Sequence, residues 1–317
     1  MPEIPDIEAY IEALRPRVLG RRWLGVRLVS PFLLRSVVPP LERLVGGTVN
    51  GVERLGKRIV FEIEVPASPG DDRPAATYFL VLHLMIAGRL QWRPVGAPVP
   101  KGRGLAAFDF ESGTLVLTEA GKTRRASLHL AGGREELALL DPGGLEVIGS
   151  TAEAFAGALR RENHTLKRAL TDPHIVRGIG NAYSDEILHY ARLSPFKQTG
   201  TLSDLEIERL HHAAITVLGE WIERLRVEAR EAFPTKVTAF RPEMAVHGRF
   251  GEPCPVCGTR VQRIVYAQNE CDYCPTCQTG GRILADRSLS RLLRDDWPRT
   301  VDDLERPPTA DDSRKPV

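Results

Sequence analysis

The chain has 317 residues, of which 42% are hydrophobic and 26% charged, which is enough for at least one full core and more naturally for two or three domains. The net charge is only +2, and the residues from Asp295 onward are acidic on balance, so a slightly basic body permits a DNA partner without demanding one. No apolar run approaches the roughly 20 residues of a membrane span, and Met1 is followed by acidic residues instead of a basic, apolar signal region. We therefore expect a soluble cytoplasmic protein with no membrane partner.

The first part of the chain predicts one helix followed by many short strands. Apolar residues with a 3.6-residue period predict a helix over Pro5–Val18. Short strand-like runs follow, and turn signals such as Ser68-Pro-Gly-Asp separate them. Many short strands at this spacing are typical of a β-sandwich. The predicted strands are Trp23–Val29, Thr48–Val52, Arg58–Ile63, Thr77–Leu84, Leu90–Trp92, Ala106–Phe110, Thr114–Thr118 and Ala126–Leu130.

The second part changes to a helical pattern from Thr151 onward. Ser203 and Glu206 form a capping box, which predicts the start of a long helix with apolar positions at Ile207, Leu210, Ala214, Val217, Trp221 and Leu225. We expect four units: a β-sandwich domain over 1–135, a helical domain over 150–240, a metal-binding hairpin over 245–282 and a C-terminal extension over 283–317. The extension contains a helix-like run, Leu289–Leu293, and a polar end, Pro307–Val317, that we expect to be disordered.

Four cysteines form the pattern of a metal site. Cys254 and Cys257 make one Cys-x-x-Cys pair, Cys274 and Cys277 make another, and 16 residues separate the pairs. This spacing predicts one structural zinc ion bound by four thiolates. A disulfide framework is the alternative, but it suits small secreted chains. The fifth cysteine, Cys271, is either a bystander between the pairs or a fifth ligand or redox group, and we favour the bystander.

The first three residues, Met1-Pro2-Glu3, have a specific chemical potential. Removal of Met1 would leave an N-terminal proline, a secondary amine whose pKa near ~8 leaves a useful fraction unprotonated at neutral pH. Its attack on a sugar carbon forms a permanently charged iminium, which favours elimination at the neighbouring carbon in the manner of a lysine Schiff base. Glu3 is placed to transfer the protons. The alternative is that these residues are only a common polar start.

A glycine turn between two helical stretches, Gly178-Ile-Gly180-Asn181, is the next candidate site. Exposed backbone N–H groups in such a turn, followed by a helix start, are suited to bind a phosphate. Asn181 adds a side-chain donor, and Lys167, Arg168 and Arg177 add positive charge. The alternative is an ordinary turn between helices.

Several motifs together resemble the bacterial formamidopyrimidine-DNA glycosylase and endonuclease VIII family of base-excision repair enzymes, over roughly residues 1–280. The resemblance implies an α+β multidomain fold: an N-terminal helix with a β-sandwich, a helix–two-turn–helix domain, and a C-terminal four-cysteine zinc hairpin. It also implies damaged DNA in the cleft between them. The motifs are Met-Pro-Glu-Ile-Pro-Asp-Ile-Glu at the start, Leu55-Gly-Lys57, His83-Leu-Met-Ile-Ala-Gly88, Gly178-Ile-Gly-Asn-Ala-Tyr-Ser-Asp-Glu-Ile-Leu188, Val246-His-Gly-Arg-Phe-Gly-Glu-Pro-Cys254 and Cys274-Pro-Thr-Cys-Gln278.

The resemblance assigns roles to individual residues. Pro2 matches the nucleophile that attacks C1′ of the damaged nucleotide, and Glu3 matches the acid that protonates and opens the sugar. Lys57 matches a hairpin lysine that donates a proton during elimination, while Lys167 and Asn181 match phosphate ligands. The target base is expected to be flipped out of the duplex, because these groups cannot reach C1′ within the base stack.

Three departures from the family pattern concern DNA contacts. Asn269, followed by Glu270, occupies the place of an arginine that grips the lesion phosphates and assists the second elimination. Ile86 replaces an intercalating methionine but remains an apolar wedge. Arg124 and Arg125 match two DNA-binding residues of an intercalation loop whose third residue, a phenylalanine, is here an alanine. A tail of about 35 residues also follows the hairpin, where family members usually end.

The sequence therefore predicts a bifunctional DNA glycosylase and AP lyase that acts as a monomer on oxidised bases in damaged DNA. The rival hypothesis, motivated by Asn269, is a lesion- or junction-binding protein of the same fold with weak or no catalysis. An RNA substrate has no supporting feature. The segment between the long helix and Val246 is shorter than in the formamidopyrimidine branch of the family, and the intercalation loop lacks its phenylalanine. Both departures slightly favour oxidised pyrimidines, or lesions in open DNA, over oxidised purines.

Overall fold

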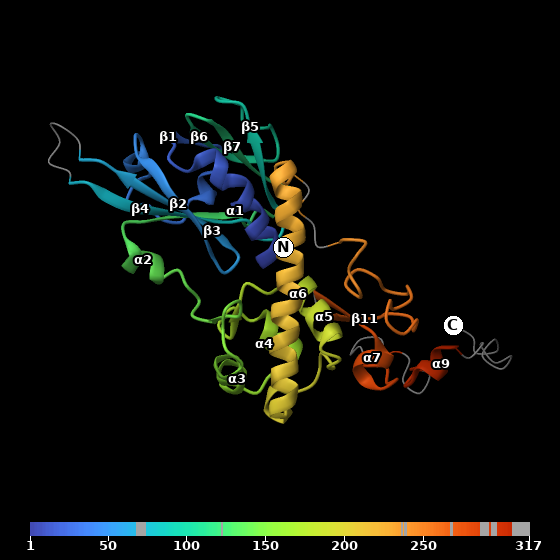
Figure 1. Cartoon of the computed structure of the whole chain (residues 1–317). Helices are drawn as coiled ribbons and strands as arrows, with labels where there is room; N and C mark the ends of the chain where they lie inside the picture. Colours follow the sequence, from blue (N-terminus) through green and yellow to red (C-terminus); the bar gives the residue numbers. More distant parts are fainter. Residues whose placement is uncertain are drawn as a thin grey trace.

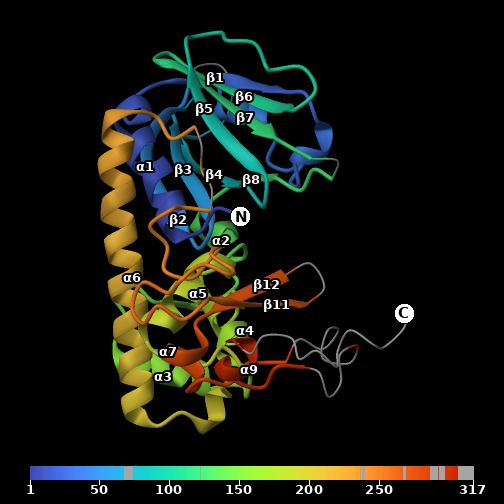
Figure 2. The ribbon, with the colours of Figure 1, turned by 90° about the vertical axis from the view of Figure 1, so that its right-hand side faces the viewer.

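A computed structural model of the chain describes residues 1–67, 74–121, 123–235, 237, 240–266, 269–285, 292 and 297–305. The protein forms two lobes, a β-sandwich with its N-terminal helix and a helical lobe with the cysteine-bearing hairpin (Figure 1). The long helix α6 (Asp204–Glu231) runs along one side of both lobes (Figure 2). Among the described residues, no helix combines the length and the apolar character needed to cross a membrane.

The first lobe consists of α1 (Ile4–Val18) and two antiparallel four-stranded sheets with strand orders β1-β6-β7-β5 and β2-β3-β4-β8. All eight strands predicted from the sequence are confirmed, with small shifts at their ends. Their bounds are Trp23–Leu28 (β1), Thr48–Leu55 (β2), Arg58–Val65 (β3), Ala76–His83 (β4), Gly88–Arg93 (β5), Gly104–Phe110 (β6), Gly113–Glu119 (β7) and Ser127–Ala131 (β8).

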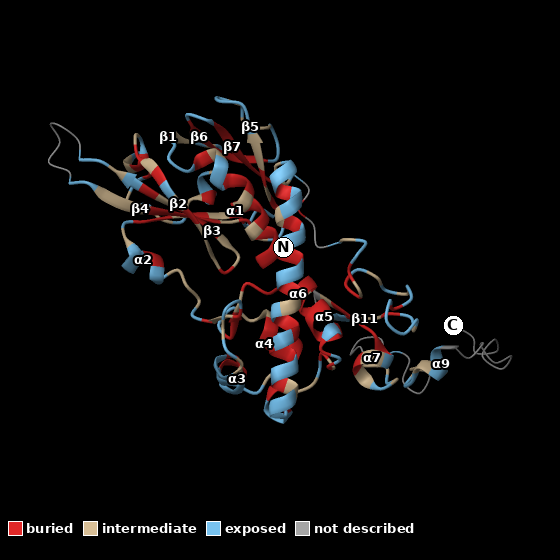
Figure 3. Ribbon diagram, in the orientation of Figure 1, coloured by how far each residue is buried: buried red, intermediate tan, exposed pale blue. Residues whose placement is uncertain are grey.

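The sandwich core forms because each strand turns its apolar residues toward the other sheet or toward α1. Trp23 and Tyr10 are completely buried in this core, and Phe110 contacts Trp23 edge-on with ring centroids 5.1 Å apart. Buried residues also follow α1 and concentrate in α4 and α5 of the other lobe (Figure 3). The apolar face predicted for the first helix therefore joins the sandwich core.

The helical lobe contains α3 (Ala152–Arg160), α4 (Leu166–Thr171), α5 (Asn181–Tyr190) and most of α6. The short helix α2 (Arg134–Ala138) and a two-residue parallel pairing of β9 (Leu145–Glu146) with β10 (Val176–Arg177) connect it to the sandwich. The capping box predicted at Ser203 and Glu206 is confirmed at the start of α6.

Ion pairs between α1 and α6 fix the two lobes against each other. Arg226 of α6 contacts Glu8 of α1 at 2.7 Å, and Arg230 contacts Glu12 one turn further on at 2.8 Å. Glu8 also accepts from Arg54 of β2 at 2.8 Å. One side of the cleft between the lobes is therefore braced, and the N-terminus lies at the junction (Figure 2).

The C-terminal part begins with the hairpin of β11 (Gln262–Tyr266) and β12 (Asn269–Tyr273), followed by α7 (Pro275–Thr279). Part of the extension returns to the segment that follows α7, because Arg282 pairs with Thr300 just before α9 (Val301–Glu305). The predicted helix-like run Leu289–Leu293 falls outside the described residues except for Leu292, and Pro307–Val317 falls outside them entirely.

Candidate active site in the cleft between the lobes

A cavity of about 1130 Å³ lies between the sandwich and the helical lobe. Its walls come from the N-terminus, the β2–β3 turn, the β4–β5 turn, the starts of α4 and α5, and the cysteine-bearing hairpin. Pro2 lies between two lining residues, whereas Arg124 and Arg125 do not line the cavity. The other predicted catalytic and DNA-binding residues all line it, and they are Glu3, Lys57, Ile86, Lys167 and Asn181.

Glu3 is held at the start of α5 by backbone hydrogen bonds. Its carboxylate accepts from the N–H groups of Gly180 at 2.6 Å, Ala182 at 2.9 Å and Tyr183 at 3.3 Å, and the residue is only 2% exposed. A negative charge at this point is stabilised by the unpaired N–H groups and the dipole of the helix. The contact joins residues 177 positions apart in the sequence and fixes the N-terminus to the helical lobe.

The glycines of the turn before α5 are required by this close approach. A Cβ atom at Gly180 would lie 2.6 Å from Cδ of Glu3, and one at Gly178 would lie 2.4 Å from the side chain of Ile4. Gly178 also has φ +92°, and its carbonyl accepts from the Ile4 N–H at 3.1 Å. The sequence predicts a phosphate site at this turn, but three N–H groups at its end bind the Glu3 carboxylate instead.

The charge of Glu3 acts on two amines near it, the amino group of Met1 and the ammonium of Lys57. Pro2 is buried, while Met1 lines the cavity. Burial lowers the pKa of the amino group at Met1, and the charge of Glu3 opposes that shift. Lys57 follows Gly56, whose φ of +59° makes the tight β2–β3 turn. Burial lowers the pKa of the Lys57 ammonium, and the charge of Glu3 again opposes the shift. Both amines are therefore biased toward the neutral form.

Lys167 lines the cavity, but its ammonium is used within the protein. The residue is 2% exposed, and Nζ donates to the Asp185 carboxylate at 2.6 Å and to the Asn181 carbonyl at 2.7 Å. Arg168 is exposed at the cavity wall, whereas Arg177 is paired with Asp141 away from it. The side chain of Asn181 remains at the wall as a candidate phosphate donor.

The predicted wedge residues lie in two different loops. Ile86 is 56% exposed in the β4–β5 turn and lines the cavity, as an intercalating side chain requires. Arg124 and Arg125 are exposed in the loop between β7 and β8, where Arg124 donates to the Gly102 carbonyl. The buried Glu119 carboxylate accepts from the N–H group of Arg125 and fixes this loop.

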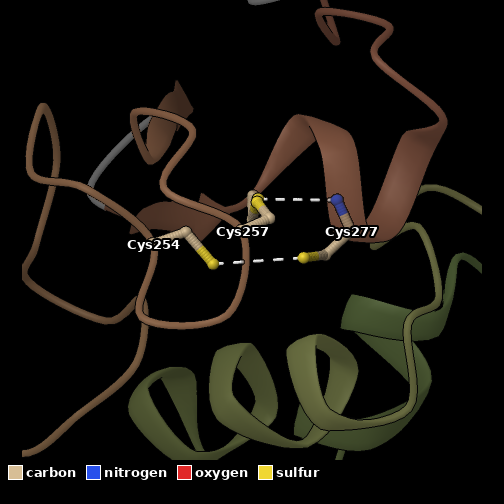
Figure 4. Close-up of side chains that lie close together, drawn as sticks. Cys254, Cys257 and Cys277 are labelled. Carbon is tan, nitrogen blue, oxygen red and sulfur yellow. Dashed lines mark hydrogen bonds between the residues drawn. The ribbon is translucent and has the colours of Figure 1, made fainter.

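The four predicted cysteines converge on one point. All four sulfur atoms lie within 4.8 Å of one another, with Cys254 and Cys277 at 4.0 Å and Cys257 and Cys274 at 3.3 Å. Tetrahedral zinc with Zn–S bonds near 2.3 Å needs sulfur atoms about 3.8 Å apart, so the cluster fits one zinc ion. The side chains of Cys254, Cys257 and Cys277 face one another across the site (Figure 4).

Cys271 lies outside this cluster. It is fully buried in β12, and burial raises the pKa of its thiol well above the usual range.

The adjacent Glu270 is paired with Arg263 at 3.1 Å, and Arg263 also donates to Asp272 at 2.8 Å. Arg263 is one of two basic residues, with Arg282, that could replace the missing arginine, but these two carboxylates already hold its guanidinium.

Glu186 and His189 of α5 tie this helix to the zinc site, and no sequence pattern described above singles them out. The buried Glu186 carboxylate accepts from the N–H groups of Ala245, Val246 and His247. His189 Nε2 lies 3.3 Å from the Cys254 sulfur. Both residues follow the glycine turn and lie three positions apart, which places them on one face of a helix. This spacing is the signal from which the sequence could have identified them.

A sandwich joined to a helical lobe and a four-cysteine hairpin, with a carboxylate buried in the intervening cleft, defines a zinc-finger enzyme of the DNA-glycosylase class. Family models match most of the chain: the formamidopyrimidine-DNA glycosylase N-terminal domain over residues 1–143, its H2TH domain over 147–230, and the zinc finger found in FPG and IleRS over 251–280. The chain belongs to the formamidopyrimidine-DNA glycosylase family, whose members are DNA glycosylases of base-excision repair.

Individual relatives agree with this assignment. The formamidopyrimidine-DNA glycosylase of Thermus thermophilus is 33% identical over 288 residues, which cover 89% of this chain and 100% of that protein. An uncharacterized formamidopyrimidine-DNA glycosylase-like protein of Mycobacterium tuberculosis is 42% identical over 155 residues, which are 49% of this chain and 94% of that protein. A Lactococcus lactis FPG mutant in complex with Fapy-dG DNA has a TM-score of 0.74 at 27% identity, covering 88% of this chain and 100% of that one.

Loss of zinc is expected to unfold the hairpin and leave the sandwich folded, because ligation supplies most of the folding free energy of such a site. Cys274→Ser or chelation should therefore remove the zinc and lower DNA affinity. Cys271→Ser is the matched control and should keep one zinc per chain. Metal analysis with circular dichroism measures both effects, and a full zinc content in Cys274→Ser would contradict the assigned ligands.

Proposed function

We propose that this chain is a bifunctional DNA glycosylase and AP lyase that removes oxidised bases through a Schiff base at Pro2. The observation that carries the proposal is the anchored Glu3 carboxylate, which lies in the cleft beside the start of the chain and shares that cleft with Lys57. Solved complexes of Lactococcus lactis FPG contain Fapy-dG, abasic-site and oxidised-pyrimidine DNA. These ligands support damaged DNA as the occupant of the cleft.

The first step proposed is attack by the Pro2 nitrogen on C1′ of a flipped nucleotide. The bond between C1′ and the base breaks, and the base leaves with the bonding electron pair and takes up a proton. The Glu3 carboxylate takes up the proton that the Pro2 nitrogen loses and passes it to the sugar ring oxygen, so the ring opens and an iminium forms between Pro2 and C1′. Pro2 is buried, and burial lowers the pKa of the amino group of Met1 beside it.

The second step proposed is β-elimination. A base removes the C2′ proton, the electron pair moves toward the iminium, and the bond from C3′ to its phosphate oxygen breaks. Lys57, whose pKa is lowered by burial, is a suitable proton carrier for this step. One structural zinc ion holds the hairpin that forms part of the cleft wall and takes no part in the chemistry.

The nucleophile is tested by borohydride trapping on a duplex with an abasic site. Wild type with Met1 removed should become covalently linked to the DNA, Pro2→Gly should trap more slowly, and an extension ahead of Pro2 should abolish trapping. Glu3→Gln should lower base excision by about 10²–10⁴-fold but keep some lyase action on preformed abasic sites. Glu111→Gln, on the surface of the sandwich, is the control.

Normal trapping by a protein that retains Met1 would show that Pro2 is not the nucleophile. No trapping by any form, together with tight binding to the same duplex, would favour the rival hypothesis of a lesion- or junction-binding protein.

The 3′ ends of the cleaved strand test the consequence of Asn269. A neutral residue cannot make a charge-assisted bidentate contact with phosphate, so we expect mainly the unsaturated aldehyde of β-elimination. Asn269→Arg should raise the 3′-phosphate fraction and steepen the salt dependence of binding by about one unit of slope. Gln262→Arg adds the same charge at the base of the hairpin and should leave the product ratio unchanged. A wild-type product pool dominated by 3′-phosphate would contradict the expectation.

A further inference from the structure

A second group of charged residues, centred on His247, lies at the wall of the same cavity. His247 is 3% exposed, and its Nδ1 atom lies 2.8 Å from the Asp185 carboxylate and 3.9 Å from that of Asp272. Asp185 belongs to α5 and Asp272 to β12, so the histidine joins the helical lobe to the hairpin. The same histidine lines the cavity between the lobes.

The group is saturated with protein cations, so it does not suit a metal ion. Asp185 accepts from the Lys167 ammonium of α4 at 2.6 Å. Asp272 accepts from Arg263 of β11 at 2.8 Å and from the Gly248 N–H at 2.7 Å. The three potential ligand atoms lie within 4.8 Å of one another, but a cation there would have to displace both charged side chains.

The hydrogen bond to Asp185 fixes the state of the imidazole ring. Because the Asp185 carboxylate can only accept, Nδ1 of His247 carries the hydrogen. Phe240 stacks on one face of the ring with centroids 5.7 Å apart and an interplanar angle of 21°. His247 lines the cavity, and its Nε2 atom makes no hydrogen bond to any described residue.

We propose that His247 binds a backbone phosphate of the DNA through Nε2, and that it does so only as an imidazolium. With the hydrogen of a neutral ring held on Nδ1, Nε2 is an acceptor and repels a phosphate oxygen. Protonation converts Nε2 into a charged donor, which forms the stronger, charge-assisted type of hydrogen bond. The inference rests on the proposed function only in requiring DNA in the cleft, where Arg168 and Asn181 also line the wall.

The surroundings of His247 favour this protonation. Burial and the charge of Lys167 lower the pKa of His247. The hydrogen bond and charge of Asp185, together with the charge of Asp272, outweigh them, so the pKa of His247 is raised. The other ionisable groups of the cluster are the Cys271 thiol and the Arg263–Glu270 pair. Phosphate binding raises the pKa of the His247 ring further. The affinity for DNA is therefore highest at a pH below the pKa of His247 in the free protein, and it falls as the pH rises through the pKa of His247 in the complex.

The test is the affinity of the full-length, zinc-loaded protein for a duplex with a tetrahydrofuran abasic analogue, which lacks the C1′ aldehyde and cannot be trapped. Binding is measured from about pH 5.5 to 8.5 at constant ionic strength. Wild-type affinity should fall by up to about tenfold per pH unit in this window. His247→Gln keeps a neutral donor and should remove this component. The control is His174→Gln, because His174 forms an exposed pair with Asp172 and does not line the cavity.

Equal pH profiles for wild type and His247→Gln, or a wild-type affinity that rises with pH, would overturn the inference. Absence of duplex binding at every pH would instead contradict the proposed function. An NMR titration of the histidines in the wild-type protein makes the test independent of whether the variant folds: the pKa of His247 should rise when the duplex is added, and an unchanged pKa would also overturn the inference.

Discussion

The hydrogen bonds from the start of α5 to the Glu3 carboxylate are the interaction on which the rest of the site depends. They place a charged group from the sandwich lobe inside the helical lobe at almost no exposure. Burial of a carboxylate is unfavourable unless its oxygens are paired, and three N–H groups at a helix start provide that pairing. As a consequence, the turn must consist of glycine where Glu3 and Ile4 approach it.

The same helix connects the cleft to the zinc hairpin. Glu3 is bound at its first turn, Glu186 in its middle accepts three N–H groups of the segment that enters the hairpin, and His189 near its end contacts Cys254. Asp185 of the same helix is hydrogen-bonded to His247, which lies in the segment that enters the hairpin. One short helix therefore positions groups from the sandwich, the helical lobe and the hairpin, which explains how three units with separate cores form one cleft.

Much of the fold followed from local patterns in the sequence. Turn signals and short apolar runs located all eight strands, and Ser203 with Glu206 located the start of α6, because these features depend on neighbouring residues. The spacing of the paired cysteines identified the zinc ligands for the same reason.

The contacts that complete the site could not be found in this way, because they join distant segments. Glycines before a helix start indicate an anion, but they do not distinguish a phosphate from the Glu3 carboxylate 177 residues away. Lys167 is predicted from the sequence as a phosphate ligand, and only the structure shows that Asp185 binds its ammonium. His247 likewise acquires its meaning only from Asp185 and Asp272, which come from two other elements.

Amide hydrogen exchange at Gly180, Ala182 and Tyr183 tests the central claim most directly. In the wild-type protein these N–H groups donate to Glu3 and should be protected, although they stand at the unpaired start of a helix. Glu3→Ala should remove that protection while the amide of Glu206, which the Ser203 side chain caps in α6, keeps its own. Equal protection of the three amides in both proteins would contradict the account.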